Sequence, residues 1–513
     1  MNHLIALPII LPAFAGVAIL LGARANLRLA RTLSLGASVG LVLVAVRLLM
    51  HVTDGTVEAY ALGNWVAPYG IVIVLDGLSG FMVLMTAIVG LGSQLYAVAG
   101  CDARGANYHA MFQFQMMGLC GAFLTGDVFN LFVFFEVLLI ASYGLLLHGG
   151  GRNRVRAGVH YVVFNLVGSA LFLIGVGTIY GVAGTLNMAD LAVKVAQVAP
   201  ADATLLQSGA LILLVVFAIK AAALPLGFWL PRTYGSATAP VAALFAIMTK
   251  VGVYAIIRVY TLIFGQGGGP VADLAQPWLL PVGLATLVVA TVGAVAGRRL
   301  RGLAAYLVIA SVGTMLTAVG LGTAESLGAA LYYMAHSTFV LAALFLVIDL
   351  ITRQRGQTGD RLKRAAPVSQ SALLGTLFLV AGVAVTGLPP LSGFIGKVLV
   401  LSSTLEAPEA TLVFALVLAG GLFSLIAMSR AGSMIFWNVT DEKPVAVQHS
   451  AARLAGVGFL LGVAVAMAVF AGPIVEFTQR VGASLVHPDV YIDAVLSDPP
   501  PAVVAEPHGA GQP

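Results

Sequence analysis

Apolar stretches of about 20 residues recur from one end of this 513-residue chain to the other. Each is long enough to cross a bilayer whose hydrocarbon core is about 30 Å thick. Only 9% of the residues are charged, against about 25% in a typical soluble protein. The alternating segments of about ten residues that build membrane β-barrels are missing. The sequence therefore predicts an all-α integral membrane protein that forms one polytopic domain.

We predict about 14 membrane spans, each roughly 20 residues long. They begin near Leu4, Thr32, Gly77, His109, Val128, Gly158, Leu205, Pro240, Gln276, Leu303, Ser326, Ser371, Thr411 and Leu454. Of the 26 lysine and arginine residues, 19 fall in the odd-numbered loops between these spans. The positive-inside rule then places the odd-numbered loops in the cytoplasm and both termini outside it. The net charge of +5 reflects this topology, and no basic cluster on a soluble domain predicts a nucleic-acid partner.

The membrane domain is expected to cover residues 1–486, and residues 487–513 are expected to form a polar, disordered tail outside the cytoplasm. The end of the chain from Pro499 is rich in proline and glycine, a composition typical of disordered segments. The two cysteines, Cys101 and Cys120, form no C-x-x-C pair and have no His/Cys cluster beside them. Neither a metal, nor a disulfide, nor a cofactor is therefore predicted.

A few ionisable residues lie well inside the predicted spans. Three are lysines, one is the single carboxylate near a span centre, and one is the single mid-span histidine: Lys220, Lys250, Lys397, Glu136 and His336. A charge at the bilayer centre costs at least about 2.5–3.5 kcal/mol on insertion scales, and such residues usually mark an ion path or a proton relay. We therefore interpret these five residues as a proton path.

The alternative interpretation for any one of these lysines is a structural ion pair or a snorkelling side chain. It is weaker for the whole set, because three bases and one acid cannot all be neutralised by pairing. Burial favours the uncharged amine, so a buried lysine can exchange a proton. For His336 a packing histidine is as good an explanation as a relay. Arg258 is expected to extend to the outer interface, and Asp76 and Asp127 are interpreted as interface residues.

Two of the spans are interrupted by proline. Span 7 breaks at "KAAALPLGF", just after Lys220, and span 12 breaks at "TGLPPLSGFIGK", just before Lys397. The two breaks lie five spans apart, and an odd offset reverses the membrane orientation. This predicts an inverted repeat of residues 109–265 and 275–435, flanked by spans 1–3 and 14. Broken helices at corresponding positions of inverted halves are typical of a transport site.

On these residues the chain resembles the antiporter-like family of membrane subunits. That family comprises the A-type and D-type subunits of Mrp multisubunit sodium/proton antiporters and the proton-pumping membrane subunits of respiratory complex I and membrane-bound hydrogenases. The resemblance covers nearly the whole chain. It places the family's buried glutamate on Glu136, its span 7 and span 8 lysines on Lys220 and Lys250, its histidine on His336, and its terminal basic position on Lys397. Some family members have glutamate at that last position.

The stretches "LTGDVFNLFVFFEV", "TKVGVYAIIRVY" and "YIDAVL" are most similar to the D-type Mrp subunits. The resemblance implies a non-enzymatic subunit of a bacterial cell-membrane antiporter that exchanges Na⁺ for H⁺. Its implied partners are a larger antiporter-like subunit of the A type, several small membrane subunits and the lipid bilayer. A proton-pumping subunit of a complex I-type oxidoreductase or a hydrogenase is the alternative, and a scaffold that retains only the fold is a third interpretation. Sodium prefers several oxygen ligands, so one buried carboxylate does not predict a complete sodium site in this chain.

Overall fold

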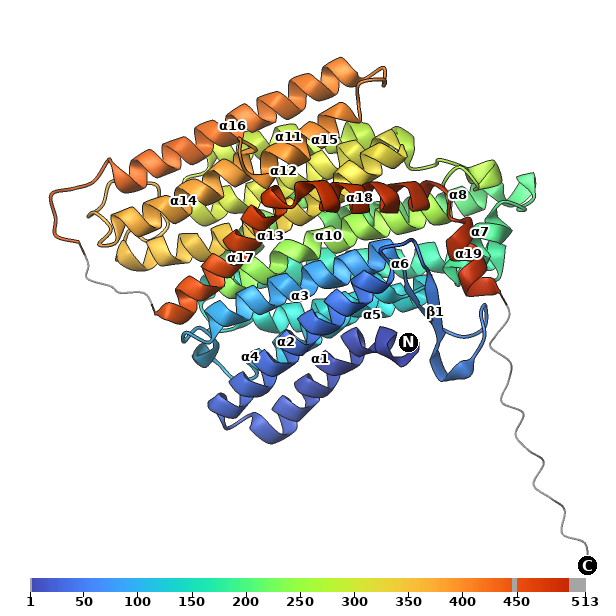
Figure 1. Ribbon diagram of the computed structural model, residues 1–513, viewed down its shortest axis with the longest axis horizontal. Coiled ribbons are helices and arrows are strands. Elements are labelled where there is room, and N and C mark those ends of the chain that lie inside the picture. The colour runs from blue at the N-terminus through green and yellow to red at the C-terminus, as the bar shows by residue number, and fades with distance from the viewer. Residues whose placement is uncertain (1, 445–449, 498–513) are drawn as a thin grey trace, which may run out of the picture.

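The computed structural model describes residues 2–444 and 450–497, and these residues are almost entirely helical (Figure 1). Twelve helices in this part of the chain are long and apolar enough to cross a membrane, judged by length and composition. The predicted count of about 14 is reached with the 17-residue helix Tyr108–Leu124 and the broken pair Ser371–Thr386 and Ser392–Ser402. The predicted all-α membrane fold is therefore confirmed.

The helices that make up these spans follow the chain in order. They are α1 (Leu7–Ala18), α2 (Leu27–His51), α3 (Gly77–Ala97), α4 (Tyr108–Leu124), α5 (Val128–Leu147), α6 (Arg152–Ala183), α8 (Pro200–Ala221), α10 (Ala239–Leu262), α11 (Gln276–Ala296), α12 (Leu300–Leu321), α13 (Ala324–Gln354), α14 (Ser371–Thr386), α15 (Ser392–Ser402), α16 (Ala410–Phe436) and α17 (Ala451–Val469).

Shorter elements connect or follow the spans. They are strands β1 (Glu58–Ala61) and β2 (Val72–Leu75), helices α7 (Met188–Val195), α9 (Leu230–Ser236), α18 (Ala471–Val486) and α19 (Asp489–Leu496), and the single turns η1 (Asn2–Ala6), η2 (Ile19–Ala23), η3 (Leu62–Asn64), η4 (Asp102–Arg104), η5 (Gly227–Trp229) and η6 (Gly269–Val271). The strands form one antiparallel hairpin in which Glu58 pairs with Leu75.

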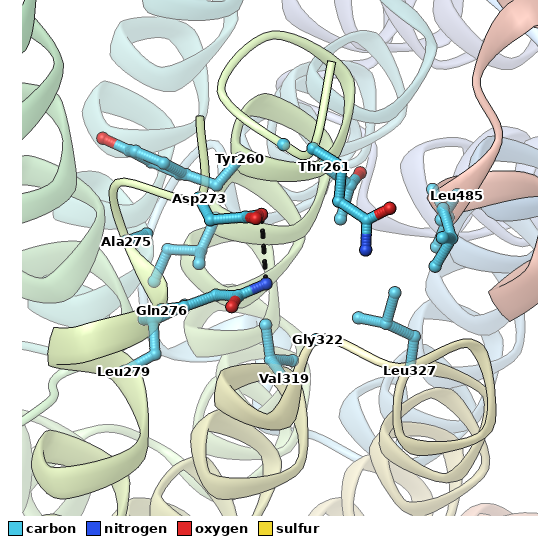
Figure 2. A pocket seen from close by; sticks show the side chains of 14 residues that line it. Tyr260, Thr261, Asp273, Ala275, Gln276, Leu279, Val319, Gly322, Leu327 and Leu485 are labelled. Carbon is cyan, nitrogen blue, oxygen red and sulfur yellow. Dashed lines mark hydrogen bonds between the residues drawn. The ribbon is translucent and has the colours of Figure 1, made fainter. Parts of the chain in front are cut away.

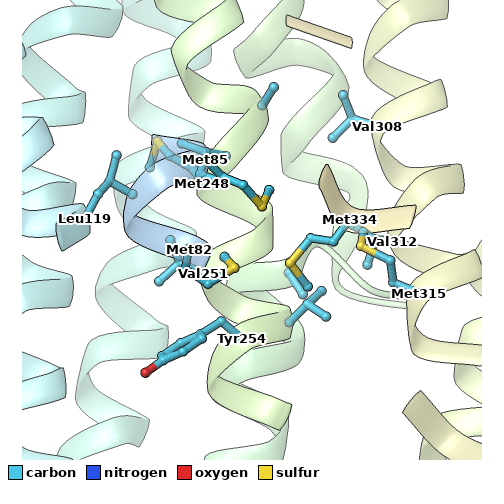
Figure 3. Packing of buried hydrophobic residues seen from close by; sticks show 14 of the residues in the cluster. Met82, Met85, Leu119, Met248, Val251, Tyr254, Val308, Val312, Met315 and Met334 are labelled. Carbon is cyan, nitrogen blue, oxygen red and sulfur yellow. The ribbon is translucent and has the colours of Figure 1, made fainter. Parts of the chain in front are cut away.

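The centre of the bundle is formed by α10 and α13. The most apolar stretch of each of these two helices is completely buried. Methionines of these two helices and of two neighbouring helices belong to the same buried cluster: Figure 3 shows Met82 and Met85 of α3, Met248 of α10, Met315 of α12 and Met334 of α13. Methionine is unbranched and fills irregular gaps between helices. The two central helices are therefore held by close apolar packing, so any polar side chain on them needs a partner inside the protein.

Both predicted helix breaks are present. The first separates α8 from α9 at residues 222–229, and the second separates α14 from α15 at residues 387–391. Gly387 ends α14 with φ of +78°, a conformation that only glycine adopts without strain. The boundaries of the inverted repeat, 109–265 and 275–435, stay a prediction.

The C-terminal region is more ordered than the sequence predicts. After α17 the chain continues as α18 and α19 (Figure 1). Tyr491 and Val495 of α19 are buried, and α19 packs against α7 and the β-hairpin. The expected disordered tail is therefore wrong for Asp489–Leu496, because long-range packing buries the apolar side of this short helix. Residues 498–513 of the expected tail lie outside the described residues.

Candidate functional site

The carboxylate at one end of the predicted path is held by a hydroxyl of the neighbouring helix. Glu136 lies on α5 and is only partly buried, and its Oε1 accepts a hydrogen bond from Ser169 Oγ of α6. Exposed apolar residues of α5, Val133 and Ile140, lie on either side of Glu136 in the sequence. An ionisable group on such a face would be costly against lipid.

The first broken-helix lysine lies in the last turn of α8 and is buried, with 5% of its surface exposed. Lys220 Nζ donates a hydrogen bond to Asn165 Oδ1 of α6 at 3.3 Å and lies 5.7 Å from the centre of the Phe135 ring. Among the described residues no ion pair joins Lys220 to Glu136. The two are linked instead through α6, which carries both of their partners.

Backbone groups at the first break are paired within the protein. Leu224 N donates to Thr286 Oγ1 of α11 at 2.9 Å, and Trp229 Nε1 donates to the Ile219 carbonyl at 3.2 Å. Unpaired backbone groups are costly in a membrane interior and are tolerated only where protein or water pairs with them. The break beside Lys220 is therefore a packed part of the bundle.

Lys250 is completely buried in the middle of α10. Its Nζ donates to Ser311 Oγ of α12 at 3.2 Å. Slightly further along α10, Gly252 packs directly on the end of α8: a Cβ at Gly252 would lie 2.4 Å from Ala221 N and 2.8 Å from the carbonyl carbon of Lys220. The two lysines thus occupy helices whose backbones are in contact at this glycine.

The second break brings His336 and Lys397 together. His336 Nδ1 lies 2.9 Å from Ser392 Oγ, at the start of α15. Lys397, further along α15, donates from Nζ to the carbonyl of Thr386, the last residue of α14, at 2.6 Å. Both side chains are therefore placed by groups that belong to the broken span.

A small cavity of about 20 Å³ lies between α12, α13, α15 and α16. His336, Lys397 and Ser311, the partner of Lys250, line its wall, together with the polar residues Thr314, Tyr333, Ser337 and Ser424. Apolar side chains form the rest of the wall. A cavity of this size has room for a water molecule, which the polar groups on its wall could bind. The structure thus places two of the five predicted residues on the wall of one cavity and connects Lys250 to it through Ser311, whereas Glu136 and Lys220 form a separate group beside α6.

Other cavities lie away from these five residues. One of about 40 Å³ is shown in Figure 2, where Gln276 Nε2 donates to Asp273 Oδ1 at 3.1 Å. Another of about 260 Å³ is lined by Asp76, Arg258 and Tyr491. No group of three His, Cys, Asp or Glu side chains in the described part of the chain is arranged to hold a metal ion.

The structure corrects the prediction for Arg258 and gives Asp76 a specific partner. Arg258 is 3% exposed, and its two terminal nitrogens donate to the two Asp76 oxygens, each at 2.7 Å. The ring of Tyr491 lies 4.9 Å from the guanidinium. Arg258 therefore does not extend to the outer surface, because a buried carboxylate lies within reach. Asp127 accepts from Asn130 N at 2.7 Å and caps α5.

A separate polar cluster ties the loop before α4 to α2. Asp102 accepts from Arg31 Nε at 2.6 Å and from Arg31 Nη2 at 2.9 Å, and it lies 3.0 Å from His109 Nε2. Burial alone would raise the pKa of the Asp102 carboxyl, but the hydrogen bonds from Arg31 and His109 outweigh burial and hold this pKa well below its usual range.

The sequence identifies the ionisable residues but not their neutral partners. These partners are Asn165 and Ser169 of α6, Ser311 of α12 and Ser392 of α15. Asn165 and Ser169 stand one helical turn apart in an apolar span, so they share one face of the helix. That spacing is a usable signal, whereas single serines are common in membrane helices and give none.

Comparison with known proteins identifies a family whose model covers more than half of the chain. Residues 125–424 match the family model described as NADH:quinone oxidoreductase/Mrp antiporter, TM. The chain belongs to this family. The matched region contains the Glu136–Lys220 group, the polar cavity and both broken helices.

Within the Mrp antiporter family the similarity extends over the full length. A relative from Rhizobium meliloti, named as the D-type subunit of a probable K⁺/H⁺ antiporter, is 41% identical over 97% of this chain and 98% of its own length. The D-type Na⁺/H⁺ antiporter subunit of Alkalihalophilus pseudofirmus is 37% identical over 97% of this chain and 100% of its own length. A chain in the structure of the Mrp complex of a Dietzia species has a TM-score of 0.87 and 28% identity, covering 97% of this chain and 100% of its own. The resemblance predicted from the sequence motifs is confirmed.

Proposed function

We propose that this protein is the D-type subunit of a multisubunit cation/proton antiporter in the bacterial cell membrane, driven by the proton motive force. It is part of a transporter and not an enzyme, like the relatives named as antiporter subunits. Protons cross the membrane through a path formed by Glu136, Lys220, Lys250, His336 and Lys397.

The observation that carries this proposal is the convergence of side chains on the cavity of about 20 Å³. His336 and Lys397 line it directly, and Lys250 reaches it through Ser311. A water molecule in such a cavity can bridge donors and acceptors that lie too far apart for direct hydrogen bonds.

Both ends of the proposed path lie at the edge of the bundle and need a neighbour. Glu136 is only partly buried between exposed apolar residues of α5. Lys397 is also partly buried, and Phe394 and Val398 of α15 are exposed beside it. A neighbouring subunit would remove the cost of holding these groups against lipid. We propose a second, larger antiporter-like subunit of the A type and small membrane subunits as these neighbours.

We propose that the binding site for the exchanged cation is formed by the complex and not by this chain alone. One relative is named for K⁺ and another for Na⁺, so either ion is compatible with the family. Alkali cations prefer several oxygen ligands, by analogy with other hard cations. A single carboxylate, Glu136, lies on the proposed path, and the remaining ligands are expected from the neighbouring subunits.

A proton-pumping subunit of a complex I-type enzyme is the second candidate, because it shares the same family description. Full-length relatives named as antiporter subunits favour the first candidate. Neighbouring genes distinguish the two: a set of small antiporter genes supports an antiporter, whereas quinone-reductase or hydrogenase genes support a pump. A scaffold without transport is disfavoured because all five ionisable residues are present.

The test is cation-dependent proton flux in vesicles that contain the complete complex. Glu136→Gln and Lys220→Ala should each abolish exchange, since each removes a titratable group from the path. Lys194→Ala is the matched control, because Lys194 lies in α7 and pairs with Asp190 away from the path. Full exchange in either path variant, with normal assembly, contradicts the proposal.

The proposed orientation has its own test. We propose that the start of α6 faces the cytoplasm and that the α10–α11 loop faces outside, so Asn153→Cys and Gln266→Cys should differ in labelling by an impermeant maleimide. Both positions are exposed, and the native Cys101 and Cys120 are buried, so background labelling is low. In right-side-out vesicles only Gln266→Cys should react. Labelling of Asn153→Cys alone reverses the orientation.

A further inference from the structure

Two polar side chains of α6 stand between Glu136 and Lys220. Ser169 Oγ donates to Glu136 Oε1 and also lies 3.0 Å from the backbone carbonyl of Asn165. Asn165, one turn earlier, accepts from Lys220 Nζ through its Oδ1 at 3.3 Å. Ser169 is 7% exposed and Asn165 is 1% exposed, so both residues are buried. The acid and the base are therefore each bonded to one residue of this pair, and Ser169 meets Asn165 at its backbone carbonyl and not at its side-chain amide.

The Ser169 hydroxyl has a single hydrogen, and both the Glu136 carboxylate and the Asn165 carbonyl can accept it. An ionised carboxylate only accepts hydrogen bonds, so Ser169 donates to Glu136 in that state. A protonated Glu136 has an O–H of its own that can donate to Ser169 Oγ. The serine hydrogen then turns to the Asn165 carbonyl, and every group still has a partner. One rotation of a hydroxyl therefore accommodates both protonation states of Glu136.

Asn165 has a complementary role toward the lysine. Its Nδ2 donates to the Tyr161 carbonyl of the same helix at 2.8 Å, which fixes the amide with Oδ1 toward Lys220. An amine carries donor hydrogens whether or not it is protonated, so Lys220 can keep this bond in both states. A Cβ at Gly168 would lie 3.8 Å from Lys220 Cε, an ordinary van der Waals distance, so this face of α6 lies directly beside the lysine side chain.

We propose that Ser169 and Asn165 hold Glu136 and Lys220 from adjacent turns of α6, and that the Ser169 hydroxyl is a hydrogen-bond switch that follows the protonation of Glu136. Ser169 is a positioning residue for Glu136, and Asn165 is a positioning residue for Lys220. The inference rests on the proposed function of Glu136 and Lys220 in proton transfer. It assigns the connection between them to α6 and not to a direct ion pair.

The experiment measures the pH dependence of cation/proton exchange by the complete complex in vesicles. Ser169→Ala removes a donor to the ionised carboxylate, so its exchange profile should move toward alkaline pH by roughly one unit. Ser169→Thr keeps the hydroxyl and should retain the wild-type profile. Thr178→Val is the matched control, since the Thr178 hydroxyl of α6 donates to the Ile174 carbonyl of its own helix. A structural role alone would lower the rate without moving the profile.

Two further variants keep the test decisive if Ser169→Ala fails to assemble. Ser169→Cys preserves size but has a weaker donor, and should shift the profile in the same direction by a smaller amount. Asn165→Asp places a carboxylate beside Lys220 Nζ. This carboxylate should hold the lysine in its charged form and so slow exchange at least about tenfold. A wild-type pH profile in Ser169→Ala or Ser169→Cys, with Glu136→Gln inactive, overturns the switch alone. Exchange by Glu136→Gln overturns the proposed function instead.

Discussion

Lys250 Nζ donates a hydrogen bond of 3.2 Å to Ser311 Oγ. Ser311 lines the same cavity as His336 and Lys397, so this bond connects Lys250 to the cavity. Lys250 lies on α10 and Ser311 on α12, so the bond crosses between two helices of the bundle. The amine itself does not line the cavity, and its connection to it depends on one neutral hydroxyl.

The first prediction concerns the order of importance around this cavity. Lys250→Ala should reduce exchange at least about tenfold, because it removes the titratable group. Ser311→Ala and His336→Ala should have smaller effects, since a water molecule can replace a hydroxyl or an imidazole in a polar cavity. Flux measurements on the assembled complex check the order, with the Lys194→Ala variant as the control. Loss of exchange in His336→Ala equal to that in Lys250→Ala would contradict it.

The second prediction concerns Gly252, where α10 packs on the end of α8. An added methyl at this position would meet the backbone at Ala221 N, 2.4 Å away, and backbone atoms there cannot move independently. Gly252→Ala should therefore destabilise the protein by about 1–3 kcal/mol and slow exchange by displacing Lys220. Thermal unfolding of the purified protein measures the first effect. Gly177→Ala, where an added methyl meets nothing within 4 Å, should be neutral or stabilising.

The third prediction concerns the buried pair Asp76–Arg258. Removing one partner of a buried ion pair leaves an uncompensated charge and costs about 3–5 kcal/mol. Asp76→Asn and Arg258→Met should each lower stability by this amount, and the double variant should lose less than their sum. An asparagine at position 76 still has a side-chain oxygen that can accept from Ser79 N, so the N-terminal cap of α3 is kept in this variant. Strictly additive losses in the thermal unfolding of the three variants would show that the pair is not coupled.

The fourth prediction concerns pH and the Asp102 cluster. Because its folded-state pKa lies below the ordinary value of about 3.9, Asp102 contributes stability above that pH and loses it as the pH falls through the folded-state pKa. Asp102→Asn should lower the unfolding temperature at neutral pH, by an amount that corresponds to roughly 1–3 kcal/mol.

The difference from the wild type should narrow as the pH falls below about 4. Asp202→Asn is a suitable control, because Asp202 is an exposed carboxylate in the first turn of α8. A pH-independent difference for Asp102→Asn would mean that the asparagine disturbs packing and that the charge is not responsible.

The fifth prediction is that the purified chain does not exchange ions by itself. Glu136 and Lys397 lie at opposite ends of the proposed path and both are partly exposed in the isolated chain. Liposomes with an imposed pH gradient should show no sodium- or potassium-dependent proton flux until the other subunits are present. Robust exchange by the chain alone would mean that a cation site lies among its own backbone carbonyls, beside Pro225 or Pro390.

The spans, the two breaks and the ionisable residues were predictable from the sequence because each differs clearly in residue type from the sequence around it. Lys220 and Lys397 are conspicuous in a membrane helix, and proline marks a break wherever it follows a long apolar run. The neutral partners were not predictable in the same way, because a serine such as Ser311 can bond to its own helix or to another one. Ser311 does both, since it donates to the Val308 carbonyl of α12 and accepts from Lys250, and only the packing of α10 on α12 reveals the second bond.

Long-range pairing explains the two errors. Arg258 was expected to extend to the outer surface, but its partner Asp76 lies 182 residues away in the chain and local sequence gives no sign of it. The helix at Asp489–Leu496 is short, and only its contacts with α7 and the hairpin reveal that its apolar side is buried.

The two broken spans place their lysines on opposite sides of the break. Lys220 belongs to the half-helix before its break, whereas Lys397 belongs to the half-helix after it. Yet Lys220 lies in the last turn of α8, and Lys397 bonds to the final residue of α14. The C-terminal end of a helix carries the negative pole of the peptide dipoles, equivalent to about half an elementary charge. The charge of Lys397 is therefore compensated by oriented backbone, whereas Lys220 combines its place at a helix C-terminus with a bond to the Asn165 side chain. A glutamate at position 397 would face a pole of its own sign.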